Sequence, residues 1–197
     1  SLEATRNTMN EPPAGRDYLD ESFVKNAAIV LAGAHFDGCD FDQMRFADTS
    51  LRRTVFQDCR FVGCDLSRIR VDEASFRDCS FLNCRMMGID WSALGGLVFS
   101  IRLRECNARF SLFDELNMKW CSFSDTDLSE CSFQNTDLSG LKFDGCDLSR
   151  SGLNGAKLIG TDLSGATGIS LEPGRCQLRG TRINMDTAVA TLEAQGL

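Results

Sequence analysis

The residues of this 197-residue chain best able to do chemistry are ten cysteines, which could ligate metal, form disulfides or act as nucleophiles. All ten fall in one slot of a five-residue repeat, two residues before a position that is nearly always Phe, Leu or another apolar residue. The segment Cys59-Arg-Phe-Val-Gly-Cys64-Asp-Leu-Ser-Arg contains the unit twice. A shared slot indicates a geometric cause. The cysteines are Cys39, Cys59, Cys64, Cys79, Cys84, Cys106, Cys121, Cys131, Cys146 and Cys176.

Three uses of these thiols are open at this point. Free cysteine behaves as a small buried hydrophobe, and a common inward slot favours that use. A disulfide framework is the second, and metal ligation by the pairs Cys59/Cys64 and Cys79/Cys84 is the third, although no histidine accompanies either pair. Because abundant free thiols are typical of reducing compartments, we expect a cytoplasmic protein.

Other catalytic patterns are missing from the sequence. The single histidine, His35, occupies an outward slot with no paired nucleophile or second ligand. The acidic stretch Asp37, Asp40 and Asp42 lacks the ligand order of a calcium loop. There is no nucleophile elbow, phosphate loop or dinucleotide fingerprint. We therefore predict a protein that is not an enzyme and has no catalytic residue, cofactor or metal.

The apolar positions of the repeat form two registers. The first recurs every five residues from Leu31 to Trp91, and the second from Val98 to Leu163, returning at Leu178 and Ile183. Seven residues separate Trp91 from Val98, so two extra residues interrupt the repeat, and we expect a bulge or loop there.

A five-residue period matches neither an amphipathic helix nor an extended strand. A chain whose inward residue recurs every five residues must turn a corner in between, and coils that bury little alone must stack as a solenoid. The 20-residue sub-period predicts four sides per coil, with Phe41, Phe61 and Phe81 stacked on one side. The fold class is therefore all-β.

Segments such as Thr126-Asp-Leu-Ser-Glu and Thr136-Asp-Leu-Ser-Gly fit an A/C/S/T-(D/N)-(L/F)-x-x pattern. This pattern resembles that of pentapeptide-repeat proteins and covers most of the chain. The resemblance implies a right-handed quadrilateral β-helix.

We divide the chain into a flexible N-terminus and cap (residues 1–30), two repeat blocks (31–91 and 98–183), an interruption (92–97) and a short C-terminal helix (184–197). Asn184 is the expected N-cap of that helix, and Met185, Val189 and Leu192 share one face. The helix either caps the last coil alone or also holds a dimer through Val189, Leu192 and Leu197.

The net charge of −7 is spread along the chain. The nearest approach to a basic stripe is Arg52, Arg53, Arg68 and Arg70, which Asp72 and Glu73 adjoin. We therefore expect no direct nucleic-acid binding. No apolar run approaches the length of a membrane span, so we expect no membrane partner.

Four large apolar residues in outward slots flank the interruption: Met87, Phe110, Leu112 and Trp120. They form either a contact patch for a partner or local packing under the loop.

Three segments resemble one group of pentapeptide-repeat proteins more narrowly: Asp17-Tyr-Leu-Asp-Glu-Ser-Phe23, Cys84-Arg-Met-Met-Gly-Ile-Asp-Trp91, and Leu178 to Ile183 followed by a helix ending in Gly196-Leu197. The group contains the Qnr and MfpA quinolone-resistance proteins, the albicidin-resistance protein and the microcin-immunity protein. Its members dimerise through their C-terminal ends into an acidic rod that resembles duplex DNA, and they engage DNA gyrase or topoisomerase IV.

The group resemblance implies a homodimer that binds a type II topoisomerase and protects it from an antibiotic or toxin. The alternative is a scaffold that binds another protein or has a purely structural role. The chain departs from the group in its modest acidity, interleaved with arginine, and in its short interruption. Candidate partner contacts are Asp125, Asp127, Glu130, Asp137, Asp144, Asp147, Met87 and Trp120.

Overall fold

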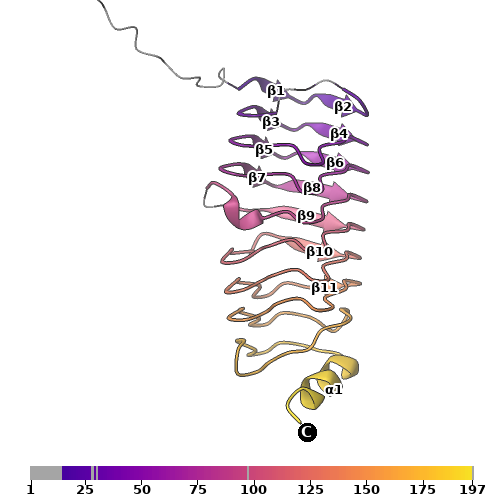
Figure 1. Ribbon diagram of the computed structural model, residues 1–197, viewed down its shortest axis with the longest axis vertical. Helices are drawn as coiled ribbons and strands as arrows, with labels where there is room; N and C mark the ends of the chain where they lie inside the picture. The colour runs from indigo at the N-terminus through magenta and orange to yellow at the C-terminus, as the bar shows by residue number, and fades with distance from the viewer. Residues whose placement is uncertain (1–14, 28, 30, 97, 197) are drawn as a thin grey trace, which may run out of the picture.

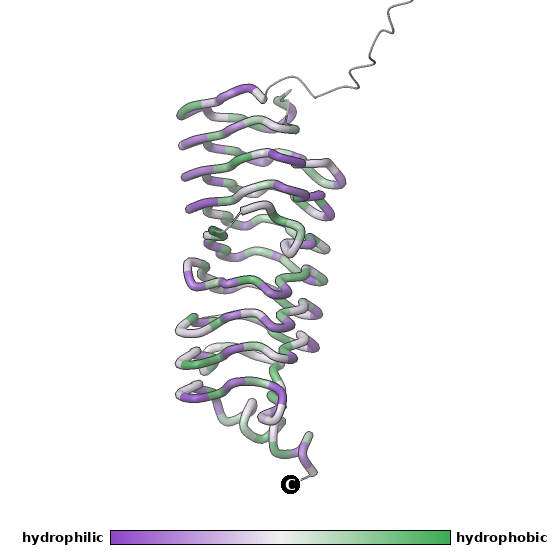
Figure 2. Tube along the Cα trace, turned by 90° about the vertical axis from the view of Figure 1, so that its left-hand side faces the viewer, coloured by the Kyte–Doolittle hydropathy of each residue, from purple (hydrophilic) through white to green (hydrophobic). Residues whose placement is uncertain are grey.

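The chain winds into a right-handed, four-sided parallel β-solenoid that ends in one short helix (Figure 1). It is described here from a computed structural model, which covers residues 15–27, 29, 31–96 and 98–196. Hydrophobic and hydrophilic stretches alternate around each coil (Figure 2), as a narrow central core requires. The fold class predicted from the repeat is confirmed.

Two sides of the solenoid carry parallel sheets. One sheet contains β1 (Asp17–Leu19), β3 (His35–Asp37), β5 (Val55–Gln57) and β7 (Ser75–Arg77). The other contains β2 (Ser22–Val24), β4 (Asp40–Asp42), β6 (Arg60–Val62), β8 (Cys79–Leu82), β9 (Ile101–Arg104), β10 (Ser122–Ser124) and β11 (Phe143–Asp144). Single parallel bridges, such as Asp127 with Asp147, join the coils on the other sides.

Pairing with a 20-residue offset brings identical slots into columns. Phe41 pairs with Phe61 and Phe61 with Phe81, so their rings stack with centroids 4.6 Å apart in both cases. The first register is buried at every position from Phe36 to Trp91, while Leu31 at its start is only partly buried. Ile183, the last position of the second register, is exposed. The stacked rings fill the interior and leave little space for a ligand.

The slot two residues before each inward residue holds small hydrogen-bond donors. The Cys59 thiol donates to the Phe36 carbonyl, the Thr136 hydroxyl to Phe113 and the Ser151 hydroxyl to Leu128, each 23 residues earlier. Cysteine, serine and threonine are interchangeable here because each reaches the same carbonyl of the preceding coil. All ten cysteines are free, and all except the half-buried Cys176 are buried, as the shared slot predicts.

The corners need a residue in the left-handed region. Along one corner these residues are Asp48, Arg68, Gly88, Phe110, Glu130 and Arg150, with φ between 54° and 66°. This conformation costs a non-glycine residue about 1–2 kcal/mol. Polar side chains and glycine tolerate it best, which explains the hydrophilic composition of the repeat's outer slots.

The interruption shifts the inward residue by one position. The hydrogen bond from the Gly95 amide to the Ala74 carbonyl keeps the regular 21-residue spacing of donor and acceptor. Cys79, however, pairs with Ile101 at an offset of 22, two more than the regular pairing offset of 20. The two extra residues therefore lie between Gly95 and Ile101. Val98, which the register places inside, is exposed, and Phe99 is buried beside Trp91 in its place. The 3₁₀ helix η1 (Trp91–Ala93) precedes this bulge.

The solenoid begins before the five-residue register. Tyr18 in β1 pairs with Phe36 at an offset of 18 residues, and the two rings stack at 4.6 Å. The first coil is therefore shorter by two residues but keeps its aromatic column. Residues 1–14, part of the expected flexible N-terminus, lie outside the described residues.

Helix α1 (Met185–Glu193) closes the C-terminal end. The Asn184 side chain accepts a hydrogen bond from the Thr187 amide at 2.8 Å, which confirms the predicted N-cap. The helix packs against the last coil through a polar face: Thr187 is buried, and the Thr191 hydroxyl accepts from the Leu171 amide. The opposite, apolar face is left exposed.

The Phe61→Ala substitution should lower the free energy of unfolding by about 3–5 kcal/mol, because it opens a cavity between two stacked rings. Urea denaturation monitored by circular dichroism measures the loss. The Trp120→Ala variant is the matched control, since Trp120 is 63% exposed. An unchanged denaturation midpoint for Phe61→Ala would show that the aromatic column does not hold the coils together.

Thiol titration should find one accessible cysteine in the native protein and about ten after denaturation. Burial raises the pKa of Cys121 and Cys131 to about 12 and that of Cys146 to about 11, so these thiols stay protonated and unreactive at neutral pH. Cys176 should react first, and Cys176→Ser should remove that phase. Rapid native-state labelling of several thiols would contradict this arrangement.

Candidate protein-binding surface

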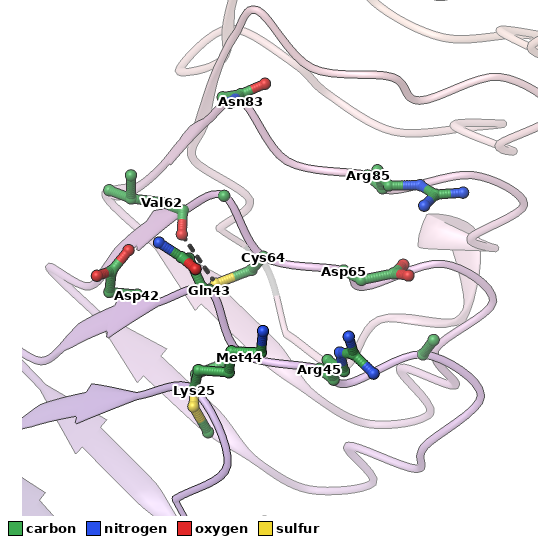
Figure 3. Close-up of a pocket in the computed structure, with 12 residues that line it drawn as sticks. Lys25, Asp42, Gln43, Met44, Arg45, Val62, Cys64, Asp65, Asn83 and Arg85 are labelled. Atoms are coloured by element: carbon green, nitrogen blue, oxygen red, sulfur yellow. Dashed lines mark hydrogen bonds between the residues drawn. The ribbon is translucent and has the colours of Figure 1, made fainter.

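An open groove of about 870 Å³ lies along the corner that follows the seven-stranded sheet (Figure 3). Gln43, Gly63 and Asn83 line it from three successive coils. The Cys64 thiol donates hydrogen bonds to the Phe41 and Val62 carbonyls. The lining residues therefore pair no nucleophile with a general base, and the groove does not resemble a catalytic site.

The remaining candidates for chemistry are also unsuited to it. His35 in β3 lies 3.8 Å from the carboxylate of Asp17, on the exposed surface of the first coils. Within the described ranges, no three His, Cys, Asp or Glu side chains are grouped to hold a metal ion.

No helix in the described part of the chain is long and apolar enough to cross a membrane.

Four of the predicted acidic contacts gather at one corner, which we call the acidic corner: Asp125, Asp127, Asp144 and Asp147. Asp125 follows β10 and its amide donates to the Asp144 carbonyl, while Asp127 pairs with Asp147 on the next side. The four carboxylates thus come from two successive coils.

Two of these carboxylates hold the corner in shape. Asp127 accepts hydrogen bonds from the Ser129 amide and hydroxyl at 3.0 and 2.6 Å, and Asp147 accepts the same pair from Ser149. The Asp-Leu-Ser unit is therefore a side-chain-capped turn.

The other two carboxylates of the acidic corner belong to exposed residues. Asp125 and Asp144 have no side-chain hydrogen bond or ion pair among the described residues, and their carboxylates lie over Gly145 and Gly165. An added Cβ at either glycine would collide with them, so glycine is what leaves room for these carboxylates.

The two remaining acidic candidates lie elsewhere and are ion-paired. Glu130, at the next corner, contacts Arg109 at 2.9 Å and Arg150 at 2.7 Å, and these arginines hold the pKa of its carboxyl below the usual range. Asp137, half a coil from Asp127, lies 3.7 Å from Lys157. The structure therefore divides the six carboxylates among three surfaces.

Met87 and Trp120 do not belong to one patch. Met87 is next to Gly88, whose amide donates to Arg109 in the following coil, and Phe110 and Leu112 share that corner. Trp120 is half a coil away from Phe110, is 63% exposed, and its carbonyl accepts from the Ser100 hydroxyl beyond the interruption. The separation of Phe110 from Trp120 could not be predicted from their closeness in the sequence. The ten residues between them pass two corners of the coil and so lead to the opposite side.

The residues predicted for a dimer lie partly on the exposed face of α1. Met185, Val189 and Leu192 are 77%, 45% and 50% exposed. Leu197 lies outside the described residues.

Comparisons with known proteins agree with this geometry. A model of the pentapeptide repeat region matches residues 29–107, and a model of eight pentapeptide repeat copies matches residues 101–140 and 131–167. Together they cover more than half of the chain. The chain belongs to the pentapeptide-repeat family.

Solved pentapeptide-repeat structures share the fold. A trypsin-treated, singly substituted form of QnrB1, described as a plasmid-mediated fluoroquinolone resistance protein, aligns with a TM-score of 0.59 and 16% identity. The alignment covers 93% of this chain and 97% of that one. A second trypsin-treated form with a different substitution aligns over the same shares, with a TM-score of 0.52 and 19% identity. A search of curated protein sequences finds no significant match.

Acidification should destabilise this pentapeptide-repeat protein below about pH 5. Ser164 and Arg182 lower the pKa of Asp162, and Ser139 lowers that of Asp137. The Arg150 and Arg109 guanidinium groups lower the pKa of Glu130. Groups with a lowered folded-state pKa stabilise the protein above their unfolded pKa, near 4, and lose this effect as the pH falls through the folded value.

The melting temperature should therefore be level from pH 7 to about 5 and fall at lower pH. Asp137→Asn should flatten the fall, whereas Asp125→Asn, which removes a carboxylate with no partner among the described residues, should not. Equal pH profiles for wild type and Asp137→Asn would contradict the assigned role of this turn.

Proposed function

We propose that this chain is a non-enzymatic, protein-binding solenoid that binds a type II topoisomerase and protects it from an antibiotic or toxin. The observation that carries the proposal is the fold shared with QnrB1 over nearly the whole length of both chains. The segments at 17–23, 84–91 and 178–197, which resemble the gyrase-interacting group, support it further. Ten free thiols favour a cytoplasmic location.

The acidic corner is the surface proposed to contact the topoisomerase. Asp125 and Asp144 can face cations on a partner without first breaking an ion pair. Groups that develop charge complementarity across an interface mainly set its specificity and association rate. Trp120, exposed at another corner, would add apolar contact area.

A second candidate function is a scaffold for a different protein. One side of the rod carries Arg45, Asp65, Arg85, Asn107, Asp127 and Asp147 in a single column of paired positions. A continuous negative stripe, as a DNA mimic would need, is interrupted by these arginines. Interleaved charge favours the scaffold, so the two functions must be separated by experiment.

We further propose that α1 forms a homodimer contact. Its polar Thr187 face is used on the last coil, and its Met185, Val189 and Leu192 face has no cover within the described chain. An exposed apolar stripe on a helix this short is well suited to a second copy of the same stripe.

The Val189→Asp/Leu192→Asp double variant should be monomeric by light scattering at concentrations where wild type is dimeric. Two carboxylates on each copy would be desolvated and face each other in the contact. The Glu193→Lys variant is the control, because it changes exposed charge on the same helix and keeps the apolar stripe. A double variant that stays dimeric would assign the contact to another surface.

The Asp125→Asn/Asp144→Asn variant should weaken protection of DNA gyrase by about tenfold or more in protein concentration, because both carboxylates face the partner. Supercoiling and cleavage assays with a quinolone or peptide poison measure it, together with retention of gyrase subunits on immobilised protein. The control is Glu115→Gln, which removes one charge half a coil from Asp125. Wild-type binding should weaken as salt rises through ~0.1–0.3 M.

The two candidate functions give opposite results in this assay. If wild type at micromolar concentration alters neither activity, and no gyrase subunit is retained at low salt, the scaffold is the correct function.

A further inference from the structure

The corner that carries Phe110 departs from the rule for left-handed positions. Of the non-glycine residues with positive φ in the described chain, Phe110 (φ 62°) is the only one with an apolar side chain. A bulky residue in this conformation is strained. Phe110 is also 46% exposed, so burial does not compensate. Strain kept without a packing gain is a sign of function.

The ring is held from one side and open on the other. The Arg109 guanidinium lies 5.0 Å from the ring centroid and is itself fixed by Glu130 at 2.9 Å. In the preceding coil the same corner position is Gly88. A Cβ placed on Gly88 would meet only Arg68, at 3.4 Å, so the Phe110 ring does not fill this space.

We call this position the Gly88 notch. Gly88 carries no side chain, and Arg68 and Phe110 occupy the equivalent positions in the coils on either side. Met87 precedes Gly88, and Leu112, 39% exposed, lies just beyond Phe110. An apolar centre with charged surroundings is the composition of protein-interaction hot spots.

Two guanidinium groups flank the notch along the rod. Arg70, two coils before Leu112, has no ion pair among the described residues. Arg150, two coils after Phe110, shares its single carboxylate, Glu130, with Arg109. Both can therefore accept a further carboxylate. Four coil spacings of about 4.8 Å separate them, roughly 19 Å, which an extended segment of about six residues spans.

We propose that the Gly88 notch is a docking site for an extended acidic segment of a partner protein. An apolar side chain of the segment enters the notch against Phe110, and carboxylates on either side pair with Arg70 and Arg150. This site lies one corner away from the acidic corner and goes beyond the topoisomerase proposal. The acidic corner prefers a cationic surface, whereas the notch prefers an anionic segment.

A selection from a phage-displayed library of random twelve-residue peptides tests the site. Peptides enriched on wild-type protein should carry an aromatic or aliphatic residue flanked by Asp or Glu. Their affinities, measured by fluorescence anisotropy, should fall about tenfold or more for Phe110→Asn and for Gly88→Asn. Asparagine tolerates positive φ, so both variants should fold. Glu115→Asn, at another left-handed corner, is the matched control and should bind like wild type.

Stability provides a second readout that does not need a peptide. Phe110→Asn relieves strain and should raise the melting temperature by about 2–4 °C, since Phe110 is retained for contact and not for packing. A fall of several degrees would make Phe110 a structural residue and overturn the proposal.

Three binding results would also overturn it: no enriched peptide, enriched peptides that are basic, or equal binding to wild type and Phe110→Asn. A duplex DNA oligonucleotide is a further arm. Tighter binding of the duplex than of the acidic peptides, lost in Phe110→Asn, would assign the notch to nucleic acid and reject a protein segment. Loss of gyrase protection by Asp125→Asn/Asp144→Asn leaves the notch untouched, so the two proposals fail separately.

Discussion

Backbone hydrogen bonds between each coil and the next determine the position of the repeat residues in this solenoid. A single coil buries almost nothing, because its inward side chains meet only across a narrow interior. Once the coils pair at a 20-residue offset, each inward ring acquires two neighbours, as Phe61 does from Phe41 and Phe81. Core packing, the hydroxyl and thiol bonds to the preceding coil, and the columns of surface charge all follow from that offset. Even the shortened first coil and the two-residue bulge keep the pairing register.

The same offset determines where function can reside. The interior is filled by stacked rings and small side chains, as the Phe41, Phe61 and Phe81 column shows. The outer slots are fixed in position and repeat at about 4.8 Å, so they can present side chains in chosen order along a line. Such a surface suits recognition of another macromolecule. The two surfaces that we propose for partners, the acidic corner and the Gly88 notch, are such lines on neighbouring corners, with opposite proposed charge preferences.

The aspartates of the acidic corner divide between those whose carboxylates shape a turn and those whose carboxylates have no partner among the described residues. In the sequence, Asp127 and Asp147 cannot be distinguished from acidic residues that would contact a partner. In the structure, their carboxylates accept hydrogen bonds from Ser129 and Ser149, two residues later. The carboxylates of Asp125 and Asp144 lie over glycines and accept no such hydrogen bond among the described residues. A change of charge therefore has different effects at adjacent positions: it disturbs the turn at Asp147 and only the surface at Asp144.

The periodicity of the sequence was enough to predict the four-sided coil, the buried register from Phe36 to Trp91, the inward thiols and the N-cap at Asn184. These features are local or strictly periodic, so each residue's place follows from its number in the repeat. Features that depend on contacts between coils could not be predicted in this way. Phe99 is buried in place of Val98. The reason is that the pairing of Cys79 with Ile101 in the neighbouring coil determines where the extra residues after Gly95 project, and this pairing is not visible in the sequence. Phe110 and Trp120 are near in sequence but half a coil apart. Helix α1 packs on the last coil through its Thr187 face and leaves its apolar face exposed. A helical pattern alone cannot predict which face packs on a neighbouring element.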